Sequence, residues 1–167
     1  MIYDLPGNRD RIDQADIIDG CPIVSVFSFD LDGVQPPELD VARSRVIVLS
    51  QTCDLIQEKS NWASVATVLD AQTLVDQGML KRDNIRGPIR SGRVFGWYFL
   101  PKSERLGLSE MIVNLRQLHT VSVDLLSELC LRGQRRGRLL CPYREHLAKH
   151  FADTFSRIGL PEPYETD

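Results

Sequence analysis

Apolar residues recur along the chain in patterns that predict about five β-strands. Residues 23–29 alternate apolar with small polar side chains, whereas the segment 45–50 carries a continuous apolar run. Alternation is typical of a strand with one buried face, and a continuous run of a strand buried on both faces. By the same criteria we expect further strands over residues 63–69, 93–100 and 110–115.

Helical spacing of apolar residues is clearest near the end of the chain. Pro142 suits the first turn of a helix, and Gly159 suits its C-terminal cap. Residues 71–77 and 123–131 are shorter helix candidates. The apolar stripe of the last helix comprises Tyr143, Leu147, Phe151, Phe155 and Ile158.

This order of elements, strands first and helices afterwards, predicts an α+β fold. We expect an antiparallel β domain with one or two C-terminal helices packed on it. Several short strands with turn-rich connections favour a small barrel. A chain of 167 residues fits one domain. We divide it into a barrel core over about 18–121, a helical part over about 122–160 and a frayed tail over 161–167.

Charge is distributed unevenly along the chain. Residues 1–80 hold five basic residues against thirteen acidic ones, and residues 81–167 hold fifteen against ten, which gives −8, +5 and a net charge of −3. Residues 1–19 read as an acidic loop, 81–92 as a basic loop and 132–138 as a basic turn. Either the two halves attract each other within one fold, or a basic surface faces a charged partner.

Composition favours a soluble, cytoplasmic domain. No apolar run approaches the roughly 20 residues that cross a bilayer, and the first residues do not form a signal-peptide pattern. The four cysteines, at positions 21, 53, 130 and 141, form no CxxC pair, so we expect free thiols and no metal or other cofactor. Cys21 and Cys130 lie in apolar surroundings and are expected to be buried.

The segment Ser50–Asp54 (Ser-Gln-Thr-Cys-Asp) is the first candidate for chemistry. It follows an expected buried strand, which would support it rigidly. Cys53 beside Asp54 has the residue types of a thiol nucleophile, and His119 would have to supply the general base. The alternative is that Thr52 and Asp54 form a local turn while Cys53 packs.

Arginines of the C-terminal half form the second candidate. Their guanidinium groups suit phosphate, and Trp97 and Tyr98 could stack against bases, a combination compatible with single-stranded nucleic acid. An acidic pI of about 5.6 argues against it, and the alternative is that these arginines pair with the acidic half. The residues concerned are Arg116, Arg132, Arg135, Arg136, Arg138 and Arg144.

Two histidines at helical spacing form a third, weaker candidate. His146 and His150 are four residues apart and would share one face of the last helix. A glutamate does not follow His146, as it would in a zinc-binding HExxH motif. We therefore expect a pair without metal.

Part of the chain resembles a known family. The segments Gly20–Phe29 and Arg43–Ser50 are similar to the opening of the MazF/PemK toxins, and the likeness covers about residues 18–69. The resemblance implies an SH3-like barrel and metal-independent RNA cleavage, with Arg45 (less well Arg43) and Thr67 in the family's functional positions. Val46 stands where that family usually has proline, and the C-terminal helical part is additional. In Ser50–Asp54 and Pro142–His146 the chain also looks like bacterial proteins of unknown function.

The sequence therefore leads to a ranked set of hypotheses. The first is a cytoplasmic bacterial binding module of a toxin or phage-defence type system, which contacts nucleic acid, such as single-stranded RNA, or a partner protein, and which could form a homodimer. The second is a MazF-like endoribonuclease using Arg45 and Thr67, which would stabilise charge on the phosphate. The third is a thiol hydrolase using Cys53.

Overall fold

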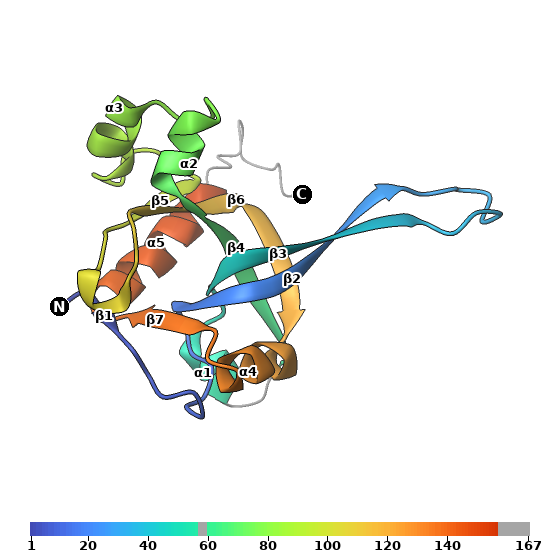
Figure 1. Cartoon of the computed structure of the whole chain (residues 1–167), viewed down its shortest axis with the longest axis horizontal. Helices are drawn as coiled ribbons and strands as arrows, with labels where there is room; N and C mark the ends of the chain where they lie inside the picture. The colour runs from blue at the N-terminus through green and yellow to red at the C-terminus, as the bar shows by residue number, and fades with distance from the viewer. Residues whose placement is uncertain (57–59, 157–167) are drawn as a thin grey trace, which may run out of the picture.

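Seven antiparallel strands form one sheet in the computed structural model, which describes residues 1–56 and 60–156 (Figure 1). Their spatial order is β1-β7-β2-β3-β4-β6-β5. The strands are β1 (Tyr3–Asp4), β2 (Asp16–Ser28), β3 (Glu38–Val48), β4 (Trp62–Asp70), β5 (Trp97–Leu100), β6 (Met111–Ser122) and β7 (Arg135–Leu139).

Short helices lie at both ends of the sheet, with α2 and α3 at one end and α1 and α4 at the other (Figure 1). The longest helix, α5, packs Leu147 and Phe151 into the core. The helical elements are α1 (Thr52–Ile56), α2 (Ala71–Asp76), α3 (Arg82–Asn84), the π-helix η1 (Ile85–Ile89), the 3-10 helix η2 (Glu104–Leu106), α4 (Val123–Leu131) and α5 (Tyr143–Phe155).

The inner end of strand β3 is buried on both faces, as the continuous apolar run over residues 45–50 predicts, whereas its outer positions 38–43 are exposed. Ile47 and Leu49 pack into the core that α5 closes, and Val46 and Val48 pack into a second core with α4. Successive side chains of a strand point to opposite faces, so a strand covered on both sides needs apolar residues at every position. A third cluster lies around Ile112 under α2 and η1.

The sheet is open, and the prediction of a closed barrel was wrong. Strands β1 and β5 are its edges, and no backbone ladder joins them among the described residues. The two edges nevertheless approach each other, because the Tyr3 hydroxyl donates a hydrogen bond of 2.8 Å to the Pro101 carbonyl just after β5. We call this contact region the seam. A two-residue β1 is too short to continue a ladder, and side chains bridge the seam instead.

The α+β class and the C-terminal helices are confirmed, but three local predictions were wrong. Residues 132–138 contain strand β7 and not only a turn, residues 81–92 contain α3 and η1, and residues 1–19 contain β1 and the start of β2. In β7 every second residue is buried, namely Arg135, Gly137 and Leu139. The sequence does not show this alternation, because one buried position is an arginine and another is a glycine. The predicted Ile158, Gly159 and tail 161–167 lie outside the described residues.

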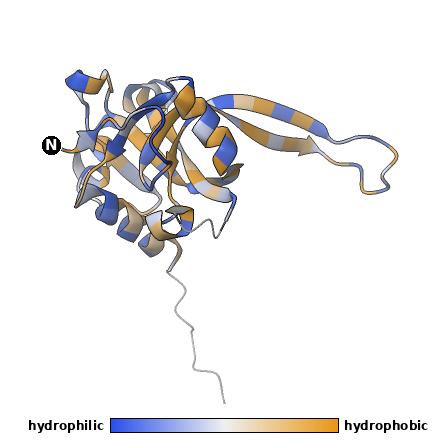
Figure 2. Ribbon diagram, turned by 90° about the horizontal axis from the view of Figure 1, so that it is seen from below, coloured by the Kyte–Doolittle hydropathy of each residue, from blue (hydrophilic) through white to orange (hydrophobic). Residues whose placement is uncertain are grey.

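The outer halves of β2 and β3 leave the body of the molecule as a two-stranded ribbon (Figures 1 and 2). We call residues 22–43 the arm. Its strands are paired from Pro22 opposite Arg43 to Ser28 opposite Glu38. An irregularity between Ile18 and Cys21, where Gly20 has a φ of 70°, separates β2 from β7. Beyond it no third strand covers the ribbon among the described residues.

Candidate functional site

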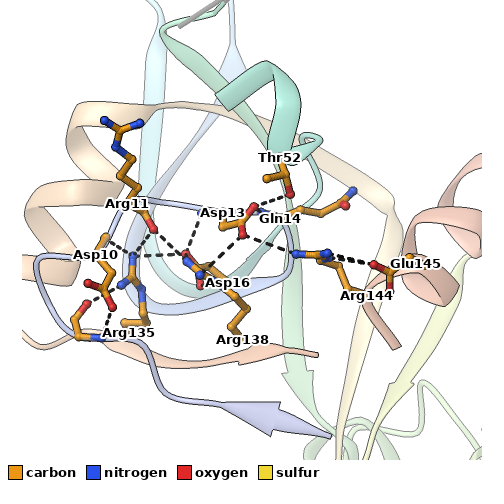
Figure 3. Close-up of polar contacts among 11 residues, drawn as sticks. Asp10, Arg11, Asp13, Gln14, Asp16, Thr52, Arg135, Arg138, Arg144 and Glu145 are labelled. Atoms are coloured by element: carbon orange, nitrogen blue, oxygen red, sulfur yellow. Dashed lines mark hydrogen bonds and ion pairs between the residues drawn. The ribbon is translucent and has the colours of Figure 1, made fainter. Parts of the chain in front are cut away.

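Acidic residues of the N-terminal segment meet arginines of the C-terminal half in one group of ion pairs (Figure 3). Asp16 is fully buried, and its carboxylate accepts hydrogen bonds from Arg138 Nε at 2.7 Å and Nη2 at 2.9 Å. The buried Arg135 lies 3.3 Å from the same carboxylate. We call Asp13, Asp16, Arg135, Arg138 and Arg144 the charge cluster.

Arg135 also holds the N-terminal loop in place. Its guanidinium donates hydrogen bonds to the backbone carbonyls of Gly7 at 2.6 Å, Asp10 at 2.9 Å and Arg11 at 3.2 Å. Its Nε has no hydrogen-bond partner among residues 1–56 and 60–156. A buried cation needs both a counter-ion and acceptors for its N–H groups, and the loop supplies the acceptors.

Arg138 and Arg144 extend the cluster towards the surface. Burial disfavours the charged form of Arg138, but the hydrogen bonds and charge of Asp16 outweigh it and raise the pKa of Arg138. Both arginines lie 3.6 Å from an oxygen of Asp13, and Arg144 is 3.0 Å from Glu145 at the start of α5. The cluster therefore connects the N-terminal loop, β7 and α5.

The first sequence candidate, Ser50–Asp54, joins this cluster through Thr52. The Thr52 hydroxyl donates to the Asp13 carboxylate, and the Gln14 side-chain amide donates to the Leu49 carbonyl at 3.1 Å. Between these residues and Asp16, the buried Ala15 has a φ of 66°, in the left-handed region that non-glycine residues rarely adopt. The contacts of the cluster hold this strained turn.

The thiol constellation is not brought together. Cys53 is exposed, and its sulfur lies 3.6 Å from the Gln51 side-chain oxygen and 3.8 Å from Asp54. His119 of β6 pairs with Val65 of β4 and lines a groove at the root of the arm. Its Nε2 is buried and has no hydrogen-bond partner among the described residues. Burial lowers the pKa of His119. No contact between Cys53 and His119 occurs in the described part of the chain.

Arg45 and Thr67, the residues implied by the toxin resemblance, belong to opposite faces of the sheet. Arg45 forms an ion pair with Asp19, with Nη2 and Oδ2 at 3.1 Å, and its Nη1 lies 3.0 Å from Met111 Sδ in the core closed by α5. Thr67 pairs with Val46, whose side chain points to the other face. The Thr67 hydroxyl is buried and has no hydrogen-bond partner in the described part of the chain.

The remaining arginines of the second candidate also have partners within the chain. Arg136 lies 3.3 Å from Asp19, and Arg132 pairs with Glu128 at 2.8 Å on the surface of α4. Arg116 donates to the Phe95 carbonyl at 3.0 Å, and its guanidinium lies 6.0 Å from the centre of the Trp97 ring. The alternative that the basic half pairs with the acidic half is therefore confirmed for Arg135, Arg136, Arg138 and Arg144.

His146 and His150 share a face of α5, as their spacing predicts, with ring centres 6.4 Å apart. His150 is buried and lies 3.1 Å from the Trp97 carbonyl, and burial lowers its pKa. Within residues 1–56 and 60–156, no group of three or more His, Cys, Asp or Glu side chains could hold a metal ion. In the same ranges, no helix has the length and apolarity needed to span a membrane.

The arm is the candidate interaction feature that the sequence did not reveal. Its largest side chains are exposed although apolar, with 62% of Val26, 74% of Phe27 and 64% of Phe29 accessible to solvent. Figure 2 shows apolar stretches along its length. Asp32-Gly33 between two alternating runs is a hairpin signal, which could have revealed the ribbon but not its exposure.

Comparison with family models and with curated proteins identifies no relative of this chain. The features that bear on function are the arm, the charge cluster and the cavities of this structure.

Proposed function

We propose that this chain is a protein-interaction module that binds a partner protein through its arm. The exposed apolar side chains of the arm carry this proposal. Isolated two-stranded ribbons are at best marginally stable in water, and large exposed apolar patches mark interaction sites. Each large apolar side chain that becomes buried contributes about 1.5–3 kcal/mol. The exposed apolar residues of the arm are Val24, Val26, Phe27, Phe29, Leu31, Val34, Leu39 and Val41.

The arrangement of the arm supports binding along one of its faces. Val24 is opposite Val41, and Val26 is opposite Leu39, so these four side chains share a face. Both ribbon edges also offer unpaired backbone groups to an added strand. At the root of the arm, a groove of about 660 Å³ contains the exposed Trp62 and continues the available surface.

The charge of the arm favours a protein partner with basic residues over nucleic acid. The arm carries Asp30, Asp32, Glu38 and Asp40 against the single cation Arg43. Phosphate groups would be repelled by this surface, whereas lysines or arginines around an apolar groove would be attracted. The partner is therefore a protein surface with an apolar centre and a basic rim.

Cross-linking from the arm inside the cells that make this protein tests the proposal. A photoreactive amino acid replaces Phe27, and the control carries it at Met79, which is exposed outside the arm. We expect a discrete cross-linked protein from position 27 that resists nuclease, with the attached peptide flanked by lysine or arginine. The double variant Val26→Ser, Leu39→Ser should lose this product.

Three outcomes would contradict the proposal. Equal products from positions 27 and 79 would show that the arm has no special role. A nuclease-sensitive product, or RNA cleavage by the purified protein that Arg45→Ala abolishes, would favour the MazF-like endoribonuclease instead. The toxin or phage-defence setting would then be tested through the identity of the bound molecule.

A further inference from the structure

A second feature, away from the arm, is a cavity at the seam between the two edges of the sheet. Its volume is about 290 Å³, close to the lower end of the range for small-molecule pockets. Apolar side chains from three parts of the chain line it, among them Ile2 beside β1, Leu100 on β5 and Leu139 on β7. The cavity exists because the sheet does not close by a backbone ladder at this point.

Two basic side chains accompany this apolar lining, Arg90 after η1 and His146 on α5. Arg90 is exposed, and its guanidinium lies 5.4 Å from the centre of the Phe99 ring, which also lines the cavity. Among the described residues, no carboxylate lies within ion-pair distance of Arg90. Arg90 therefore differs from the arginines of the charge cluster, whose charges are already matched.

A buried tyrosine fixes the orientation of His146. The Tyr98 hydroxyl lies 3.2 Å from His146 Nδ1 and donates a hydrogen bond of 3.3 Å to the Tyr143 carbonyl. Burial raises the pKa of Tyr98 to about 12, so its hydroxyl stays protonated at neutral pH. A side chain at Gly92 would lie 3.9 Å from His146 Nε2, so glycine at this position keeps the approach to that nitrogen open.

The backbone next to Arg90 has an uncommon conformation. Residues Ile85–Ile89 form a π-helix that contains Pro88, and π-helical turns occur frequently at functional sites. The turn buries Ile85 and Ile89 and places Arg90 immediately after them. Ile89, the last residue of this π-helix, and Arg90 after it line the seam cavity, whereas Ile85 and Arg86 line a different pocket beside α2.

We propose that the seam cavity binds a small organic anion. Its apolar body would occupy the space between Ile2, Leu100 and Leu139, and its carboxylate or phosphate group would meet Arg90 and His146. The apolar lining of the cavity favours the apolar body of the ligand. The Arg90 guanidinium, which has no ion-pair partner among the described residues, favours its anionic group. This inference is independent of the partner proposed for the arm.

Binding of four matched probes to the full chain tests the inference. Octanoate and octyl phosphate carry both parts, octanol lacks the charge, and inorganic phosphate lacks the apolar body. We expect either amphipathic anion to bind at least about tenfold more tightly than octanol or inorganic phosphate, by calorimetry. In NMR spectra, the amide signals of Gly92 and Leu100 should shift on binding.

Variants locate the site and separate binding from folding. Arg90→Gln should weaken octanoate binding about tenfold, and Ile2→Trp should fill the cavity and abolish binding. Arg86→Gln is the matched control, since this arginine lies in the π-helix that precedes Arg90 but lines the other pocket. This variant should bind octanoate as the original chain does. Thermal unfolding of each variant verifies that the fold is retained.

Four results would overturn the inference. Equal binding of octanol would indicate an apolar hole without anion recognition, and equal binding of inorganic phosphate would indicate a surface anion only. Unchanged affinity in Arg90→Gln would remove the assigned cation. Absence of binding by all four probes at millimolar concentration would remove the site itself.

Discussion

The arm and the charge cluster invert the usual distribution of residue types in opposite ways. In the arm, Val26 and Phe27 are apolar but exposed, whereas in the cluster Asp16 and Arg135 are charged but buried. The buried charges satisfy one another within the chain, with added backbone acceptors for Arg135. Among the described residues, no side chain covers the exposed apolar residues of the arm in a comparable way. The comparison shows that the cluster is satisfied within the fold, and it is the reason why we propose a second molecule for the arm.

The largest expected effect comes from breaking the cluster at its centre. Asp16→Ala should lower the free energy of unfolding by about 3–5 kcal/mol, because it leaves two arginines without their shared counter-ion. Urea denaturation measures this change. Asp153→Ala, which removes an exposed partner of Lys149, should change it by no more than about 0.5 kcal/mol. Similar losses in the two variants would show that burial of the charges is unimportant.

A smaller effect should follow when α1 is detached from the cluster. Thr52→Val removes the hydroxyl that bonds the Asp13 carboxylate, and we expect a loss of about 1.5 kcal/mol in urea denaturation. Thr73→Val is the control, since its hydroxyl contacts an exposed carboxylate of Asp70 at 3.3 Å. An equal cost for both variants would argue that Thr52 does not link Ser50–Asp54 to the cluster.

Because the apolar side chains of the arm are exposed, substituting one of them should weaken partner binding without lowering the stability of the fold. Val26→Ser should change the free energy of unfolding by less than about 0.5 kcal/mol, because the side chain is already in water, yet it should weaken the cross-link from position 27. Ile23→Ser at the root is the contrasting variant. Ile23 is buried in the core with α4, and its loss should cost about 2 kcal/mol or more. A large stability loss in Val26→Ser would mean that the arm packs within its own chain.

The smallest expected effect is a local pH response at the tip of the arm. Backbone N–H groups of Asp32, Gln35 and Val34 donate to the Asp30 carboxylate and lower the pKa of Asp30. The order that these bonds give the turn is therefore complete above the ordinary aspartate pKa and is lost as the pH falls through the lowered value. NMR amide shifts of Val34 and Gln35 should follow this titration.

Asp30→Asn provides the control for that titration. Asparagine retains an acceptor for the turn but does not titrate in acid, so the pH response of the two amides should disappear. Persistence of the same response would assign it to another carboxylate of the arm.

Local patterns predicted several elements closely. The helix expected over 123–131 coincides with α4, and the strand expected over 63–69 differs from β4 by one residue at each end. Both segments are regular in their spacing and bounded by clear changes in side-chain type. The strand β7 was missed because its buried position 135 is a charged arginine. This charge can be buried because the carboxylate of Asp16, distant in sequence, pairs with it.

The candidate sites were predicted only in part, for the same reason. The sequence pointed to Thr52 and to the arginine-rich segment as separate candidates. Their spacing along the chain did not indicate that Asp13 contacts both of them. The exposure of the arm was equally hidden, because alternating apolar residues look the same whether a third strand covers them or not. Pairing among distant segments decides both questions.

Side-chain type and short-range spacing were enough to predict the α+β class, the two-sided burial at the inner end of β3 and the opposite charges of the two halves. Three other features follow from long-range packing alone. The sheet stays open at the seam, Asp16 meets Arg138 across 122 residues, and the arm extends from the body without a third strand beside it among the described residues. These features depend on which segments, distant in sequence, pack against each face of the sheet and pair with each charge. That pairing is fixed only when the whole chain folds.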